Sequence, residues 1–198
     1  PHLLDMRETY AIRLNMAGQN AIATRVAEEL NRLEPDNPRW LRLLGICIQD
    51  IDTKKSIEYL KKEFELTGSS DTLVRLGRGY QLCDDPKAAR HHYYGALEIN
   101  PHKTLAITNL VFKYNELSPE LHRKANEALD HGHGVQDQYF HVCAIKLAKQ
   151  VRGKVSLSWY ATALQRYQLV LNGEGFRDEH SKLCLLYTSP SPRDRQKS

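Results

Sequence analysis

Hydrophobic and small residues recur at helical spacing between positions 70 and 101, with polar residues between them. Leu73, Leu76 and Tyr80 follow one another at steps of three and four, the period of one face of an α-helix. A second run of this kind follows and stops at Pro101, because proline cannot continue a helix. The marker residues are Leu73, Leu76, Gly77, Tyr80, Ala89, Tyr93, Ala96 and Pro101. The pattern predicts two antiparallel helices that approach closely at the small residues.

This spacing resembles the tetratricopeptide repeat, a unit of roughly 34 residues built from two helices. The resemblance implies an all-α fold, a right-handed superhelical solenoid of stacked antiparallel helix pairs. It also implies a concave inner face that is lined mainly by the first helix of each pair. Such a unit is a scaffold without built-in chemistry, so the pattern specifies a shape more closely than a ligand.

The same register extends in both directions and predicts about five helix pairs, whereas period-two runs typical of strands are nearly absent. The first pair is marked by Tyr10, Ala11, Leu14, Ala23, Ala27 and Leu30. The second is marked by Leu41, Leu44, Gly45, Ile48, Ile57, Leu60 and Phe64. The fourth is marked by Ile107, Leu110, Val111, Tyr114, Ala125, Ala128 and Leu129. The fifth is marked by Phe140, Cys143, Ala144, Leu147, Tyr160, Ala163 and Leu164.

Residues that cap or break helices fall between the marker runs. Asp52 or Thr53 is expected to cap the second helix of the second pair, and Gly68 to close it. Ser118 followed by Pro119 is a helix start, because Ser accepts backbone N–H groups and Pro suits the first turn. These positions set the expected helix boundaries.

The last fifteen residues, 184–198, resemble a translated sequencing adapter, although a genuine Pro/Ser-rich disordered tail is the alternative. We therefore expect a helical array over 1–172, a linker or the start of a further repeat over 173–183, and a non-native tail. The chain opens at Pro1 inside an expected helix, which suggests an internal piece of a longer protein.

The formal net charge of +4 is weak support for a nucleic-acid partner, because the adapter-like tail contributes two of these charges. Cys47, Cys83 and Cys143 occupy helical positions that suit small buried residues, so we expect reduced core thiols rather than disulfides. The expected location is the cytoplasm. No apolar run is long enough to span a bilayer.

Candidate catalytic and metal-binding groups fail on spacing. His91 and His92 are adjacent on an expected helix and therefore point apart, and His131 and His133 lie in a Gly-rich turn. A zinc site needs three or four converging ligands, and the chain has no Cys-x-x-Cys motif. His141 and Cys143 are two positions apart on a helix, which separates them. We expect no metal, no cofactor and no enzymatic activity.

The remaining functional signal is cationic and faces the expected inner surface. Positions next to the packing residues place arginines of two neighbouring repeats there, and the planar guanidinium group matches phosphate and carboxylate. The predicted ligand-binding residues are Arg39, Arg42, Arg75, Arg78, Asn109, His141 and Lys149. The alternatives are an anion-binding groove for RNA or an acidic peptide, and arginines that merely pair with acids of the helix faces or lie in water.

Residues 30–115 also resemble the interferon-induced proteins with tetratricopeptide repeats. The resemblance rests on the Pro35-Asp36-Asn37 start, the helix end at Gln49-Asp50, and the closing run Ala96 to Pro101. It implies an innate antiviral role in which a basic tunnel holds the 5′ end of single-stranded RNA. Among the residues with which that family contacts RNA, the resemblance carries over only Arg75, and this residue is displaced by one position.

Three hypotheses follow for a non-catalytic binding scaffold. The first is an RNA-binding protein that holds single-stranded or 5′-phosphorylated RNA in the basic groove. The alternative is a protein–protein interaction module that binds peptide segments of a partner. Some tetratricopeptide arrays bind the C-terminal carboxylate of a peptide through a cation in the groove. Glu8 stands at the position where that cation would be needed, which argues against this mode of peptide binding. The third hypothesis is a structural segment of a larger assembly.

Overall fold

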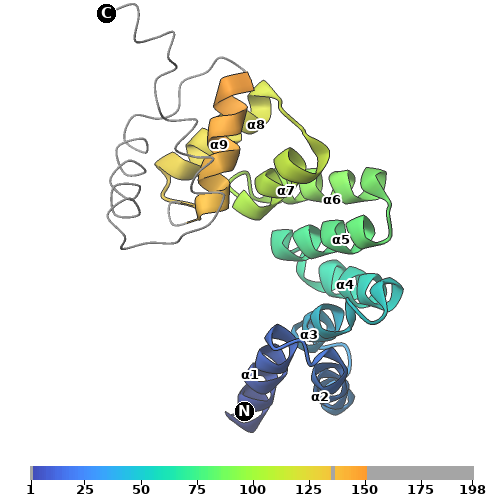
Figure 1. Ribbon diagram of the computed structural model, residues 1–198. Helices are drawn as coiled ribbons and strands as arrows, with labels where there is room; N and C mark the ends of the chain where they lie inside the picture. Colours follow the sequence, from blue (N-terminus) through green and yellow to red (C-terminus); the bar gives the residue numbers. More distant parts are fainter. Residues whose placement is uncertain (1, 135–136, 151–198) are drawn as a thin grey trace, which may run out of the picture. The chain divides into compact units, whose positions relative to one another are not determined.

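The computed structural model describes residues 2–134 and 137–150, and its regular elements there are all α-helices (Figure 1). They are α1 (His2–Met16), α2 (Asn20–Leu33), α3 (Pro38–Ile48), α4 (Thr53–Thr67), α5 (Ser70–Leu82), α6 (Pro86–Ile99), α7 (Thr104–Tyr114), α8 (Pro119–Asp130) and α9 (Gln138–Gln150). The predicted all-α class is thereby confirmed over the described residues. The chain divides into two compact units, residues 1–100 and 101–198.

The first unit consists of three helix pairs that follow one another in chain order (Figure 1). Each helix packs against the next, and α1 also contacts α3. Ala11, Ala23, Ala27 and Leu30 are completely buried between the first helices, together with Cys47 of α3. The core therefore runs continuously from one pair to the next, as expected when each repeat buries its apolar faces on its neighbours.

Glycine allows the two helices of a pair to approach closely. A Cβ atom on Gly45 would lie 2.6 Å from Cγ of Leu60, and one on Gly77 would lie 2.7 Å from Cε1 of Tyr93. In the second pair the hydroxyl of Ser56 also donates to the Gly45 carbonyl at 2.6 Å. The predicted roles of Gly45 and Gly77 as close-approach positions are confirmed.

The helix ends follow the predicted chemistry. The Asp52 side chain accepts a hydrogen bond from the Lys55 amide and caps α4, and Gly68 ends that helix in the left-handed region with φ 62°. Ser118 accepts from the Leu121 amide and caps α8, with Pro119 in the first turn. These local signals determine where the helices start and stop.

The second unit contains α7, α8 and α9, and α9 packs against the other two. Phe140, Cys143 and Leu147 of α9 are completely buried, which confirms the predicted first helix of the fifth pair. The second helix of that pair, the expected linker or further repeat at 173–183 and the adapter-like residues 184–198 lie outside the described residues.

Two predicted core positions are wrong. Tyr10 is 55% exposed, because α1 packs against α2 and α3 with a different face, whereas Leu44, the equivalent position in α3, is buried. Cys83 is an exposed thiol at the C-terminal cap of α5, one residue beyond the helix that would have buried it. Cys47 and Cys143 are buried and free, as predicted.

Candidate functional site in the first unit

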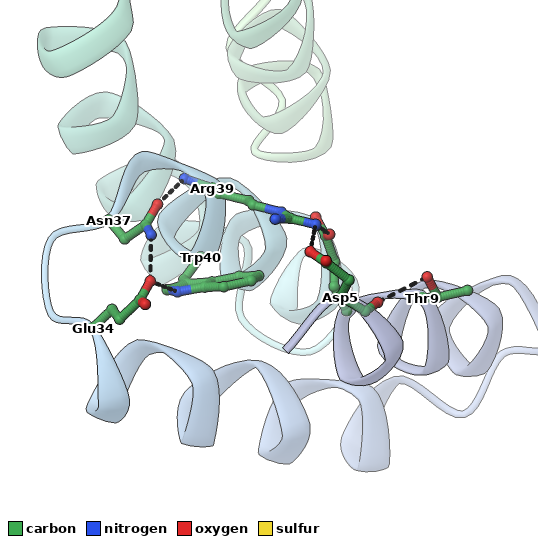
Figure 2. Close-up of polar contacts among 7 residues, drawn as sticks. Asp5, Thr9, Glu34, Asn37, Arg39 and Trp40 are labelled. Carbon is green, nitrogen blue, oxygen red and sulfur yellow. Dashed lines mark hydrogen bonds and ion pairs between the residues drawn. The ribbon is translucent and has the colours of Figure 1, made fainter. Parts of the chain in front are cut away.

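Arg39, at the start of α3, is occupied by acids of α1. Its guanidinium group donates through Nε to Oε2 of Glu8 at 2.7 Å, and Nη2 also pairs with Glu8. Nη2 pairs with Asp5 as well, at 2.7 Å (Figure 2). These hydrogen bonds, to Glu8 first and then Asp5, raise the pKa of Arg39 despite the opposing effect of burial. Arg39 therefore pairs with acidic side chains of a neighbouring helix, which is one of the two alternatives given above for the predicted groove arginines.

The turn before α3 fixes the start of that helix. The Asn37 side chain accepts from the Arg39 amide at 3.0 Å and donates to Oε2 of Glu34 at 2.6 Å (Figure 2). The indole of Trp40 donates to the same oxygen at 2.9 Å. These two hydrogen bonds, from Trp40 and then Asn37, lower the pKa of Glu34. The arginine–acid contact is thus held by an ordered turn.

Arg42, Arg75 and Arg78 form a different arrangement on α3 and α5. Burial is the main cause that lowers the pKa of Arg75. Among the neighbouring charges Asp71 and Glu63 oppose that shift, and Arg42 and Arg78 add to it. None of the three arginines belongs to an ion pair among the described residues. The fold therefore brings Arg42 and Arg78 within electrostatic reach of Arg75, together with the acids Asp71 and Glu63.

Gln49 brings a further donor to the same place. Its side chain is 9% exposed and points at α5, where a Cβ atom on Gly79 would lie 3.8 Å from Nε2 of Gln49. The same Cβ atom would lie 2.9 Å from Cγ1 of Ile57 in α4, so this part of α5 faces the second helix pair. Gly79 and Arg75 are one helical turn apart on α5. We call this contact the α3–α5 seam, formed by Arg42, Gln49, Arg75 and Gly79.

The seam contains two buried donors without acceptors. Nε2 of Gln49 and Nε of Arg75 are both inaccessible to solvent and have no hydrogen-bond partner. Sequence reasoning placed Arg75 on the inner face but had no means of showing that the fold leaves its Nε atom, or Nε2 of Gln49, unsatisfied. That property depends on which acids stand nearby, and the nearest buried carboxylate, Glu63, accepts from Thr67 and Thr72 instead.

The other predicted ligand-binding residues, Asn109, His141 and Lys149, belong to the second unit. The Asn109 amide donates to the Leu105 carbonyl of its own helix at 2.7 Å. His141 is only 5% exposed, which does not fit an open ligand-binding position. Lys149 lies on α9, and its side chain is outside the described part of the chain.

The described residues offer little for catalysis. Burial raises the pKa of Cys47 to about 11 and raises that of Cys143 further, so both thiols are poor nucleophiles at neutral pH. No group of three or more His, Cys, Asp or Glu side chains in the described ranges is arranged to hold a metal ion. Within the same ranges, every helix is too short or too polar to cross a bilayer.

Comparison with solved structures identifies the architecture. One similar structure, described as the crystal structure of MamA protein, has 18% sequence identity and a TM-score of 0.55, covering 88% of this chain and 97% of that chain. A second, described as the crystal structure of MamA, also has 18% identity, a TM-score of 0.57, and coverage of 82% and 96%. The chain has a tetratricopeptide-type solenoid fold.

At this identity the likeness concerns the fold alone. No family model matches the chain, and the search of curated proteins found no significant match. The comparisons thus confirm the predicted stacking of antiparallel helix pairs. They give no support to the narrower resemblance to the interferon-induced proteins.

Proposed function

We propose that the protein is a non-catalytic interaction scaffold that binds an acidic peptide segment of a partner protein across α3 and α5. The observation that carries the proposal is the group of Arg42, Arg75 and Arg78: Arg42 and Arg78 repel Arg75, Asp71 and Glu63 attract it, and none of the three arginines makes an ion pair among the described residues. A ligand with carboxylates relieves that repulsion, and guanidinium groups bind carboxylates through two parallel hydrogen bonds.

RNA is the competing ligand, since phosphate also suits arginine. Proteins that hold single-stranded nucleic acid combine cations with aromatic side chains on which the bases stack. α3 and α5 have one aromatic residue each, and neither is available: Trp40 is buried, and Tyr80 stacks on His92 with ring centroids 5.0 Å apart. A cationic surface without a stacking platform favours a peptide.

The test is a fluorescence-anisotropy titration of the full chain with a labelled Glu/Ser peptide of about ten residues, long enough when extended to reach across both helices. Binding should weaken as salt rises, because the contacts are charged. The double variant R42E/R78E should lose at least about tenfold in affinity, since two attractive charges become repulsive. R25E, an exposed arginine on α2, is the matched control and should bind like the wild type.

Equal binding by R42E/R78E and wild type would remove this function from the α3–α5 surface. A 5′-phosphorylated single-stranded RNA of similar charge serves as the second probe. If that RNA binds tightly and displaces the peptide, the RNA-binding hypothesis with its antiviral role replaces the peptide one.

A further inference from the structure

One face of α1 lies open, although the matching face of α3 is buried. Four positions of α3 in the core that it shares with α1 and α2 are at most 2% exposed: Trp40, Leu43, Leu44 and Cys47. The repeat register assigns four exposed residues to the same positions of α1: Met6, Thr9, Tyr10 and Arg13. The surface by which α3 joins the preceding helix pair is therefore uncovered on α1.

The open face of α1 is also hollowed. A hollow of about 420 Å³ follows the helix, and its lining residues are His2, Asp5, Met6, Thr9, Tyr10 and Arg13. The outer face of a terminal repeat is normally polar, which keeps a solenoid soluble. Here Met6 is 59% exposed and Tyr10 is 55% exposed. Since Met, Tyr and Arg are enriched in protein–protein interfaces, the face is typical of a docking surface.

The charges on this face indicate what binds there. Asp5 and Arg13 are eight positions apart, about 12 Å along the helix, and so lie toward opposite ends of the hollow. The Asp5 side chain is 55% exposed and pairs with Arg39 through Oδ1, which leaves its second oxygen for another donor. Arg13 has no ion-paired acid in the part of the chain that the structure describes. A complementary helix brings a base to Asp5 and an acid to Arg13.

A second copy of α1 meets this requirement when the two helices run antiparallel. About a two-fold axis near Thr9, each Asp5 lies opposite the partner's Arg13. The same axis places each Met6 beside the partner's Tyr10, because both pairs are centred within about one residue of Thr9. A parallel arrangement would instead put like charges next to each other. The antiparallel contact is isologous, the commonest form of contact between identical chains.

We propose that the protein self-associates through α1, in an antiparallel contact between two copies that joins Asp5 to Arg13 and packs Met6 against Tyr10. The inference is independent of the proposed binding of an acidic peptide. A contact confined to one 15-residue helix is smaller than the roughly 800 Å² per partner of a standard interface. The dimer is therefore weak and forms as the protein concentration rises.

Sedimentation velocity of the full chain measures this equilibrium. Monomer at about 1 μM and dimer at about 100 μM are expected, and added salt should favour the monomer because ion pairs contribute. Y10E should weaken the dimer at least about tenfold, since it places an unpaired charge in the contact. L66E, at a leucine of α4 that is 56% exposed, is the matched control and should dimerise like the wild type.

Charge reversal tests the antiparallel arrangement itself. R13E and D5R should each remain monomeric, because either change puts like charges opposite each other. An equal mixture of the two variants should dimerise, since opposite charges then meet at both contacts. Glu8 still pairs with Arg39 in D5R, and circular dichroism checks that both variants are folded. R25E, at an exposed arginine of α2, is the control for a change of net charge.

A cysteine at the two-fold axis gives an independent readout. In a C83S background, which removes the exposed native thiol, T9C should oxidise readily to a covalent dimer. Q19C, at an exposed glutamine, should do so far more slowly.

Three results would overturn the proposal. The first is a wild type that stays monomeric at about 100 μM. The second is a dimer that Y10E and R13E leave as stable as that of the wild type, which would mean that the copies meet elsewhere. The third is a mixture of folded R13E and D5R that gives no dimer.

Discussion

Arg39 and Arg75 occupy neighbouring repeats and were both predicted to bind a ligand, but the fold shifts the pKa values of their side chains in opposite directions. Arg39 lies against Asp5 and Glu8, and these hydrogen bonds raise its pKa. Arg75 lies in the α3–α5 seam, where burial lowers its pKa although Asp71 and Glu63 oppose that shift. The folded state therefore favours the charge on Arg39 and disfavours the charge on Arg75. A row of arginines identifies a candidate surface, and the acids beside it decide which arginines remain for a ligand.

The largest expected effect is a crossed result for two glutamine substitutions. R75Q should weaken the acidic peptide by about tenfold and leave the free energy of unfolding unchanged or higher, because a desolvated charge is removed. R39Q should bind the peptide as wild type does but lose about 1 kcal/mol of stability, an amount kept small because its ion pairs are partly exposed. Urea denaturation and anisotropy on the same preparations measure both quantities.

The crossed result distinguishes local charge state from total charge, since both variants remove one positive charge. Equal losses of peptide affinity in R75Q and R39Q would mean that only net charge matters. The contrast between the two arginines would then have no functional meaning.

A second prediction concerns the two acids that pair with Arg39. In D5N/E8Q the acids that hold Arg39 become neutral, so its guanidinium group loses its charged partners. Stability should fall by about 1 kcal/mol, and the peptide should bind a few-fold more tightly at low salt, because one more cation is available. Unchanged affinity in this variant would place Arg39 beyond the reach of the ligand.

The two regions should also differ in their response to acid. His92 stacks on Tyr80 of α5, and burial, followed by the charges of His91 and Lys61, lowers its pKa. The unfolded chain then binds a proton more readily than the folded one, so stability is complete at neutral pH and falls as pH drops below about 6.5. The loss should be less than about 1 kcal/mol. H92Q should remove this part of the pH profile in urea denaturation, and a slope that persists there would assign it to another group.

The smallest effect belongs to the turn that supports Arg39. Glu34 has a lowered pKa because Trp40 and Asn37 donate to its carboxylate. A group of this kind stabilises the fold above its unfolded pKa, and that contribution is lost as pH falls through the lower folded value. The window therefore lies below about 4.5, separate from that of His92. E34Q should flatten the stability profile only in this acid range, and a change confined to higher pH would contradict the assignment.

Most of the fold could be predicted because its determinants are local. The Gly77–Tyr93 contact follows from spacing within one repeat, and the caps at Asp52 and Ser118 follow from residues next to each other. Tyr10 and Cys83 were misplaced because their burial depends on how a helix is packed from outside and on its last turn, which periodicity does not specify.

The site was harder to predict because its chemistry depends on contacts between repeats. Glu8 and Arg39 were both assigned to the inner face, so the signal for their pairing was present, but a contact across 31 positions depends on how the helices stack. The unsatisfied donors of Gln49 and Arg75 had no sequence signal, because an absent acceptor is a property of the assembled seam. The burial of His141 likewise depends on how α9 packs against its neighbours, which helical spacing alone does not specify.

The most direct test is to follow the arginine Nε–Hε resonances of the full chain by ¹H–¹⁵N correlation NMR while the acidic peptide is added. R75K and R39Q assign the two signals, since each variant removes one of them. If the α3–α5 seam takes the ligand, the Arg75 signal shifts in proportion to occupancy, and the Arg39 signal stays in place because Asp5 and Glu8 already hold that guanidinium group. Saturation with peptide that moves Arg39 and leaves Arg75 unchanged would contradict the account.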